Sequence, residues 1–279
     1  MSIRVNHAEV RAGLAVAVFL CGLTVAAEER KEASYTVEPG AVVSITNHYG
    51  AITVRPSKNR EVVVQTVSHS DAVTFVNEQH GTRLELRSVS SRPGSDLADY
   101  TVLVPADAVV CLRSSNGTLH AQGLRGDIIL EAATAPVEAT NISNAHLHVK
   151  TLSGPITLTD IRDSRLDVRS VSGNITLRNL TGPSVEANSG SGRITYEGDP
   201  GASGDYLLNS RSGDLDVLIP ASAAVEIRTR TVKGQSDEAF PNVSPGPGLG
   251  NNLLLKPATV LGPRFQVRSL SGRIRVKRP

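Results

Sequence analysis

The chain has 279 residues, with 29 Lys and Arg against 27 Asp and Glu, and a formal net charge of +2. A near-neutral balance argues against a nucleic-acid partner, which requires concentrated positive charge. Aromatic residues make up 3% of the chain and Trp is absent. This weakens, without excluding, a sugar-binding surface built on aromatic side chains. The length allows one or two domains.

Residues 1–27 have the pattern of a secretory signal peptide. Residues 4–11 are weakly basic, residues 12–27 are uncharged and mostly Ala, Val and Leu, and Val25-Ala26-Ala27 places small residues at the cleavage position. The alternative is a retained membrane anchor, but this apolar run is short for a span of about 20 residues. We therefore expect an exported protein, periplasmic, on the cell surface or secreted, with no membrane span after cleavage.

Residues 28–107 have strand-like runs of irregular spacing. A charged spacer, residues 28–33, comes first. Alternation of apolar and polar residues then predicts several strands; they fall near residues 35–37, 41–45, 51–54, 61–67, 82–87 and 100–104. Terminal repeats of a stack are atypical because they must end it. We therefore expect this region to form irregular first coils of a repeat, or a cap.

A repeat organises residues 108–279. The sequence Ser-Gly-x-Ile-Thr occurs at Gly154, Gly173 and Gly192, so the glycines are 19 residues apart. Each glycine is followed by an alternating run, a polar turn with one apolar residue (Ile161 or Leu180), and a second alternating run. A fixed period of this size marks a repeat architecture. Alternation predicts strands with one buried face.

We therefore predict an all-β solenoid, similar to a parallel β-helix, with two main strands in each coil of about 19 residues and parallel pairing between coils. Further copies occur at Gly117, Ala135, Gly213 and Gly272. Ser or Thr precedes the glycine position in most copies, including Thr231, where Val232 replaces the glycine and the repeat breaks. We expect these hydroxyls to bond the backbone of the turn, and the glycines to adopt a tight or left-handed corner.

An insertion rich in Pro and Gly, residues 233–263, interrupts the repeat. Its composition opposes regular strand pairing, and a loop of this length is usually functional or disordered. The apolar run Leu253-Leu254-Leu255 would be an exposed patch if it were left in water. We expect this segment to form an extra strand or cover that shields strand edges at the C-terminal end.

The repeated Ser-Gly-x-Ile-Thr-Leu motif, with its Val-rich alternating strands behind a signal peptide, resembles the bacterial "putative adhesin" repeat proteins, also called the toast-rack domain of unknown function. The resemblance covers about residues 36–278. It implies an exported or surface β-solenoid with roles in adhesion or envelope-stress sensing, and it offers no catalytic motif to transfer. The chain departs from the family in its insertion, residues 233–263, and in showing no membrane anchor beyond the signal.

The sequence offers few candidate catalytic or metal-binding residues. His146 and His148 share one strand face, but a third metal ligand is not evident nearby. Two carboxylate pairs would lie on outer faces, where β-helix enzymes that cleave polysaccharides place theirs: Asp160 with Asp163, and Asp214 with Asp216. Alternating charge on a solvent face explains them more simply. Motifs for a catalytic triad or a phosphate loop are absent from the sequence. We predict no catalytic, cofactor-binding or metal-binding residues, and no cofactor.

These observations together favour a non-enzymatic, exported β-solenoid that acts as an adhesin-like binding or scaffolding protein of the bacterial envelope or surface. Its ligand would be a protein or a glycan of the envelope or surface. Two alternatives remain open. One is an envelope-stress regulatory partner of a membrane protein, and the other is a polysaccharide-active enzyme of the β-helix type.

Overall fold

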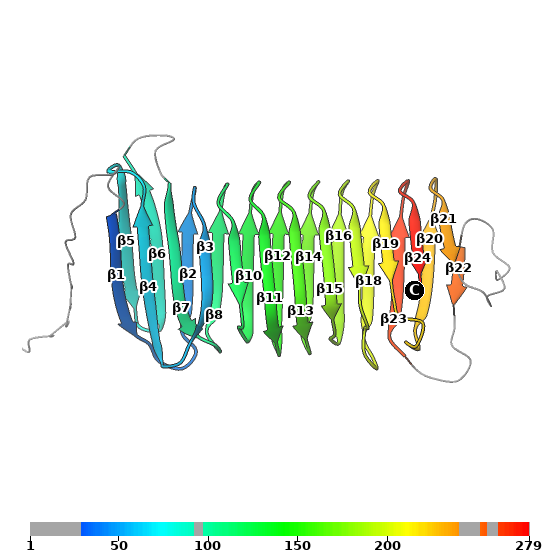
Figure 1. Ribbon diagram of the computed structural model, residues 1–279, viewed down its shortest axis with the longest axis horizontal. Coiled ribbons are helices and arrows are strands. Elements are labelled where there is room, and N and C mark those ends of the chain that lie inside the picture. The colour runs from blue at the N-terminus through cyan, green and yellow to red at the C-terminus, as the bar shows by residue number, and fades with distance from the viewer. Residues whose placement is uncertain (1–28, 92–96, 240–251, 256–261, 279) are drawn as a thin grey trace, which may run out of the picture.

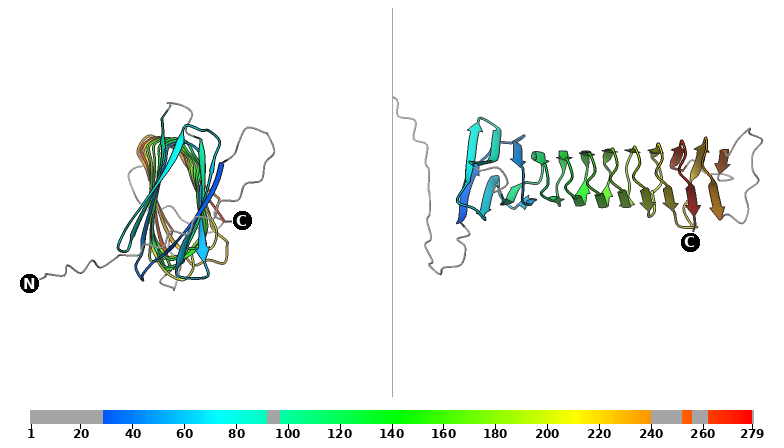
Figure 2. Two further views of the ribbon diagram at one scale, coloured as in Figure 1. Left: turned by 90° about the vertical axis from the view of Figure 1, so that its left-hand side faces the viewer. Right: turned by 90° about the horizontal axis from the view of Figure 1, so that it is seen from above.

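A computed structural model describes residues 29–91, 97–239, 252–255 and 262–278, and all regular structure in these ranges is β. Within them, two sheets of 12 strands each face one another and run along one long axis (Figures 1 and 2). Each coil of the stack contributes one strand to each sheet. The predicted β-solenoid with two strands per coil is therefore confirmed. The predicted signal peptide, residues 1–27, lies outside the described ranges.

The first sheet, sheet A, is continuous along the stack. In spatial order it contains β1 (Glu29–Thr36), β4 (Glu61–Ser68), β7 (Ala98–Pro105), β3 (Ile52–Ser57), β9 (Leu119–Gln122), β11 (Val137–Ser143), β13 (Ile156–Arg162), β15 (Ile175–Leu180), β17 (Ile194–Glu197), β19 (Leu215–Leu218), β24 (Ile274–Lys277) and β21 (Ser236–Ala239).

The second sheet, sheet B, lies opposite. From the C-terminal end of the stack it contains β22 (Asn252–Leu255), β20 (Glu226–Thr231), β23 (Arg264–Ser269), β18 (Asp205–Ser210), β16 (Ser184–Ser189), β14 (Arg165–Ser170), β12 (Ala145–Thr151), β10 (Gly126–Ala132), β8 (Val109–Ser114), β2 (Val42–Asn47), β6 (Arg83–Ser90) and β5 (Val73–His80).

In the regular body, equivalent strands of successive coils pair in parallel. Ile175 of β15 is in register with Ile156 on one side and Ile194 on the other. All three side chains are fully buried, whereas the neighbouring Thr176 faces outward. Each buried aliphatic side chain contributes about 1.5–3 kcal/mol of hydrophobic stabilisation. The face assignment made from the alternation is therefore correct, and the core is a ladder of aliphatic side chains between the sheets.

The N-terminal part mixes parallel and antiparallel pairing. The expected charged spacer, residues 28–33, is wrong, because residues 29–33 begin β1, which pairs antiparallel along the whole of β4. A further strand, β5, pairs antiparallel with β6 and was not predicted. Val73 is the only buried residue of β5, so its sequence lacks the alternation that identifies a strand with one buried face.

The order of the coils in space differs from their order in the sequence at the C-terminal end. The last coil in the chain, β23 and β24, lies between the coil of β18 and β19 and the coil of β20 and β21 (Figure 1). The insertion supplies β21 and β22, and β22 pairs antiparallel with β20 at the end of sheet B. The insertion hypothesis of an extra strand at this end is therefore confirmed by the backbone pairing.

The charged side chains of these coils favour this spatial order at the C-terminal end. Arg275 lies opposite Asp216 on one side and Asp237 on the other, and it binds both carboxylate oxygens of Asp216 at 2.5 and 2.9 Å. Arg264 likewise lies between Asp205 and Glu226. If the coils stacked in sequence order, each of these acids would lie opposite another acid, and like charges directly across a sheet are destabilising. The aromatic ring of Phe265 also stacks on Tyr206, with centroids 4.4 Å apart.

At the N-terminal end, too, the spatial order of the coils differs from their order in the sequence. The first regular coil, β2 and β3, lies between the coil of β8 and β9 and the later coil of β6 and β7. At the N-terminal end, the first regular coil of the chain is therefore covered by β6 and β7, which come later in the sequence. At the C-terminal end, the last coil is covered by β20 and β21, which come earlier in the sequence.

Candidate binding surface

The chain turns from each strand of sheet B into the next strand of sheet A along one long edge, which we call the Ser–Gly edge; Figure 1 shows these turns in a line along its top. Corner glycines of adjacent coils touch there. A Cβ on Gly173 would overlap the carbonyl oxygen of Gly154 and lie 2.9 Å from that of Ser153. The φ angle of Gly173 is outside the left-handed region. Of the two expected alternatives, the left-handed corner is therefore wrong at Gly173, although the corner glycine Gly50 has φ +93°. Glycine is needed at Gly173 because the coils approach too closely for a side chain.

A row of buried hydroxyl groups lines the inside of the Ser–Gly edge, three residues before each corner glycine. Ser170 Oγ accepts a hydrogen bond from the amide of Gly173 at 2.8 Å, and the same bond recurs between Ser210 and Gly213. The row contains Ser114, Thr151, Ser170, Ser189, Ser210, Ser269 and Thr231. We did not predict this row, although Ser170 follows Leu166 and Val168 with the same two-residue spacing and therefore faces inward.

Thr231 belongs to this inner row, which corrects its assignment as the residue before a missing glycine. Its hydroxyl accepts a hydrogen bond from the amide of Gly234 at 3.0 Å, and a Cβ on Gly234 would overlap the carbonyl oxygen of Gly272. The corner of this coil is therefore Lys233-Gly234. The repeat does not break at Val232.

The hydroxyls directly before the corner glycines face outward and link coils. Ser172 Oγ donates to the carbonyl oxygen of Leu152 at 3.3 Å, and Ser212 Oγ donates to that of Gly190 at 3.3 Å. We predicted that these hydroxyls bond the backbone of the turn. The acceptors are backbone carbonyls, but they belong to the corner of the preceding coil.

Left-handed backbone occurs on the opposite edge, where sheet A turns back into sheet B. Asn141, Asp160 and Asn179 occupy equivalent positions of three successive coils, with φ angles of 54°, 56° and 53°. Asn and Asp tolerate this conformation better than other residues with a Cβ. Asp163 is also left-handed, with φ 50°. Asp160 and Asp163 are therefore explained by the backbone geometry at this edge. Ile161 between them, expected in a polar turn, is buried and belongs to β13.

The large hydrophobic residues that are exposed in the described part of the chain all lie on the Ser–Gly edge. Leu152 and Val171 occupy equivalent positions of adjacent coils and are 55% and 60% exposed. Leu270 and Val232 form a second adjacent pair near the C-terminal end. We call the whole set the apolar row: Tyr49, Val89, Leu97, Leu152, Val171, Leu270 and Val232. Gly190 and Arg211 occupy the equivalent position in the two coils between Val171 and Leu270, so the row consists of short apolar groups on one edge. Apolar residues gathered on one edge in this way mark an interaction surface.

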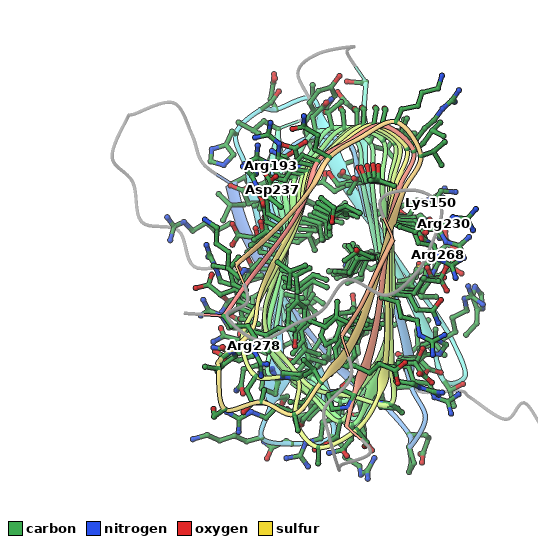
Figure 3. The ribbon with its side chains drawn as sticks, turned by 90° about the vertical axis from the view of Figure 1, so that its right-hand side faces the viewer. Lys150, Arg193, Arg230, Asp237, Arg268 and Arg278 are labelled. Atoms are coloured by element: carbon green, nitrogen blue, oxygen red, sulfur yellow. The ribbon has the colours of Figure 1, made fainter. Side chains whose placement is uncertain are left out.

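A row of mainly positive charge runs beside the apolar row, on one outward-facing position of the sheet B strands. The basic row contains Arg87, Arg113, Lys150, Arg169, Arg268 and Arg230, and Thr46, Glu131, Asn188 and Asn209 occupy the same position in the other coils. Figure 3 shows Lys150, Arg230 and Arg268 on this side of the molecule. Arg113 pairs with Glu131 at 2.7 Å and Arg169 with Asp167 at 2.9 Å. Among the described residues, Lys150, Arg230 and Arg268 have no carboxylate within 4.0 Å.

A shallow hollow of about 370 Å³ interrupts the Ser–Gly edge at the coil of β10. Its floor contains Ala132 and Ala133, whereas the next coil has Thr151 and Leu152 at the equivalent positions. The smaller side chains leave the gap. Arg113 and Glu131 line the hollow together with Lys150 from the next coil, so an apolar floor lies beside two cationic side chains.

The histidines and carboxylates considered as metal ligands or catalytic groups form ion pairs or lie on solvent-exposed faces. His146 and His148 face outward from the same side of β12, and His148 Nδ1 lies 3.2 Å from Asp167 Oδ2. Asp214 pairs with Arg193 at 3.2 Å, and Asp216 pairs with Arg275. Across the described ranges, no three His, Cys, Asp or Glu side chains gather in a way that could hold a metal ion.

Burial lowers the reactivity of two titratable groups, the thiol of Cys111 and the hydroxyl of Tyr206. Burial raises the pKa of the free thiol of Cys111 above its ordinary value, which reduces its thiolate fraction at neutral pH. Burial also raises the pKa of Tyr206 to about 12, and its hydroxyl donates to the carbonyl oxygen of Pro200 at 2.9 Å. We expect neither group to react readily at neutral pH.

The fold defines a parallel β-solenoid of two flat sheets. The model of the Toastrack DUF4097 family matches residues 42–242, and the chain belongs to this family. No protein of curated function matches the sequence. The described part of the chain contains no helical segment that could span a bilayer.

Solved structures are similar to this chain at low sequence identity. A Parabacteroides distasonis protein titled "putative lipid binding protein" is 13% identical, with a TM-score of 0.52 over 89% of this chain and 96% of its own. A Bacteroides fragilis protein titled "putative adhesin" is 13% identical over 90% of this chain and 99% of its own, with a TM-score of 0.45. The Parabacteroides distasonis protein shares the fold of this chain.

Proposed function

We propose that the protein is a non-enzymatic binding or scaffolding module, exported to the bacterial envelope or surface, that contacts its partner through the Ser–Gly edge. The observation that carries this proposal is the apolar row. Seven large hydrophobic residues are exposed in the described part of the chain, and all lie on this edge. The signal-peptide pattern of residues 1–27 and the adhesin-like resemblance support export.

The architecture suits a binding surface better than a catalytic cleft. Corner glycines in contact and hydroxyl bonds between coils hold the turns of the Ser–Gly edge in a fixed line. A rigid edge loses little conformational freedom on binding, so more of its contact energy appears as affinity. The carboxylates that a polysaccharide-cleaving enzyme would use are instead accounted for by left-handed turns, as at Asp160, or by ion pairs, as at Asp216.

The test is co-sedimentation of the purified protein with a bacterial envelope fraction. We expect the double variant Leu152→Ser with Val171→Ser to lose at least about tenfold in apparent affinity, because two exposed apolar contacts are removed. Thr157→Ser with Thr176→Ser, on the outward face of sheet A, is the control and should bind like the wild type. Equal binding by the Leu152/Val171 variant and the wild type would contradict the proposal.

A further inference from the structure

We infer that the partner of the Ser–Gly edge is an anionic lipid surface, and that the molecule lies on this surface with the Ser–Gly edge in contact with the lipid. This inference rests on the proposed function, because it names the partner of the same surface. It depends on three features of the edge: the apolar row, the basic row beside it, and the straight alignment of the corners.

The apolar row has the geometry of an interfacial anchor. Its members are on turns or, for Val89, at the end of a strand beside a turn, so they lie along the narrow side of the molecule. Leu152, Val171 and Val232 are each more than half exposed, at 55%, 60% and 64%. Adjacent coils are about 4.8 Å apart, so a pair such as Leu152 and Val171 presents a continuous apolar strip. A line of such side chains can enter the headgroup region of a bilayer together.

The basic row supplies the matching charge. The whole chain has a net charge of only +2, yet cations predominate in the row directly beside the apolar one. Lys150, Arg230 and Arg268 are exposed and have no carboxylate within 4.0 Å in the described ranges. Exposed cations on a strip beside apolar side chains attract anionic headgroups, at about 1 kcal/mol for each Lys or Arg near the surface, which is about a fivefold change in affinity.

The hollow at β10 repeats this combination on a smaller scale. Lys150 lines it together with the paired Arg113 and Glu131, beside Ala132 and Ala133. Figure 3 shows that the labelled cations of the basic row, Lys150, Arg230 and Arg268, lie on the same side of the molecule although they come from β12, β20 and β23. The charge therefore extends along the stack and is not confined to one coil.

Other partners use only part of this surface. An acidic polysaccharide would bind the cations but would leave Leu152 and Val171 in water. An apolar groove on a protein would cover the apolar row but would leave uncompensated cations at its border. An anionic bilayer is the partner that satisfies both rows at once, because apolar side chains enter the interface while basic side chains remain at headgroup level.

The experiment uses the full chain and protein-free vesicles. Co-sedimentation is measured with phosphatidylcholine vesicles that contain phosphatidylglycerol, and with phosphatidylcholine vesicles alone, at low and high salt. We expect binding to the anionic vesicles only, weakened by salt because exposed charges are screened. Lys150→Ser with Arg230→Ser should weaken it by about 25-fold. Arg162→Ser with Arg165→Ser removes the same charge near the opposite edge and should have no effect.

Each outcome decides the inference. Equal binding of anionic vesicles by the Lys150/Arg230 variant and the wild type would overturn it. Failure to bind any vesicle, while the envelope fraction still binds through Leu152 and Val171, would also overturn it but would leave the proposed function intact. Binding of soluble alginate that is unaffected by Leu152→Ser, without vesicle binding, would assign the edge to a glycan. Unfolding midpoints in urea that match the wild type establish that each variant is folded.

Discussion

The backbone of Gly173 lies directly against the carbonyl group of Gly154 in the preceding coil, so closely that a Cβ on Gly173 would overlap the carbonyl oxygen. Although φ at Gly173 is not left-handed, even alanine should be costly there, because its Cβ would overlap this backbone. We expect Gly173→Ala to lower the free energy of unfolding by about 1–3 kcal/mol or more through overpacking against backbone. Urea denaturation at an unchanged slope measures it.

Gly81→Ala is the matched control for this prediction. Gly81 has φ +58°, and a Cβ at this residue would have no other atom within 4 Å beyond its chain neighbours. Its substitution therefore tests the left-handed conformation alone, at about 1 kcal/mol. A smaller effect at Gly173 than at Gly81 would mean that the coils adapt easily, and that close stacking does not explain the corner glycines.

Two serines in the row of buried hydroxyl groups, Ser170 and Ser189, should respond differently to replacement by alanine. Ser170→Ala leaves the buried amide of Gly173 without its acceptor and should cost about 1–3 kcal/mol. Ser189 occupies the equivalent position one coil later, but its buried hydroxyl has no hydrogen-bond partner among the described residues. Ser189→Ala should therefore be close to neutral. Two equal shifts in the urea midpoint would contradict the assigned bonds.

Asp160 tests whether the carboxylates of the opposite edge have a structural role. We expect Asp160→Ala to cost about 1–2 kcal/mol, because alanine is strained at a φ of 56°. Asp160→Gly should restore most of the stability, although it removes the carboxylate that accepts a bond from Asn179 Nδ2 at 3.1 Å. Equal destabilisation by alanine and glycine would show that the carboxylate, and not the backbone conformation, is what the site requires.

Arg275 tests the charge pattern that favours the coil order. Arg275→Ala removes two hydrogen bonds to Asp216 and leaves this acid facing Asp237 across the gap, so we expect a loss of about 1.5–3 kcal/mol. Arg273→Ala removes a more exposed ion pair with Asp237 and should cost under about 1 kcal/mol. Thermal unfolding of the two variants compares them. The same loss in both would contradict a special role for Arg275.

The regular body could be predicted from the sequence because its signal repeats. Ile175 and Thr176 alternate in the same way in each coil, so the period, the two strands and the buried face all follow from the pattern. The reason for the corner glycines did not follow. A left-handed turn and a close approach between coils both require glycine, and only the stacked backbones of Gly154 and Gly173 distinguish them.

The coil order at the ends could not be read from the pattern either. The sheet B strands of the coils that contain Gly213, Gly234 and Gly272 alternate in the same way, so parallel pairing alone allows more than one order. The ion pairs of Arg264 and Arg275 distinguish these orders, and they involve residues about 60 positions apart. The apolar row was also missed, because Leu152 and Val171 are single apolar residues in polar turns until stacking aligns them.

The most direct test of the central claim, that the Ser–Gly edge is the binding surface, is a site-specific contact measurement. Cysteine is introduced either at Val171 on this edge or at Arg162 on the opposite edge, with Cys21 and Cys111 replaced by alanine. Each variant carries a polarity-sensitive dye, and its emission is recorded as envelope fraction is added. The account predicts a blue shift at position 171 and none at position 162. A shift at position 162 alone, or equal shifts at both, would contradict it.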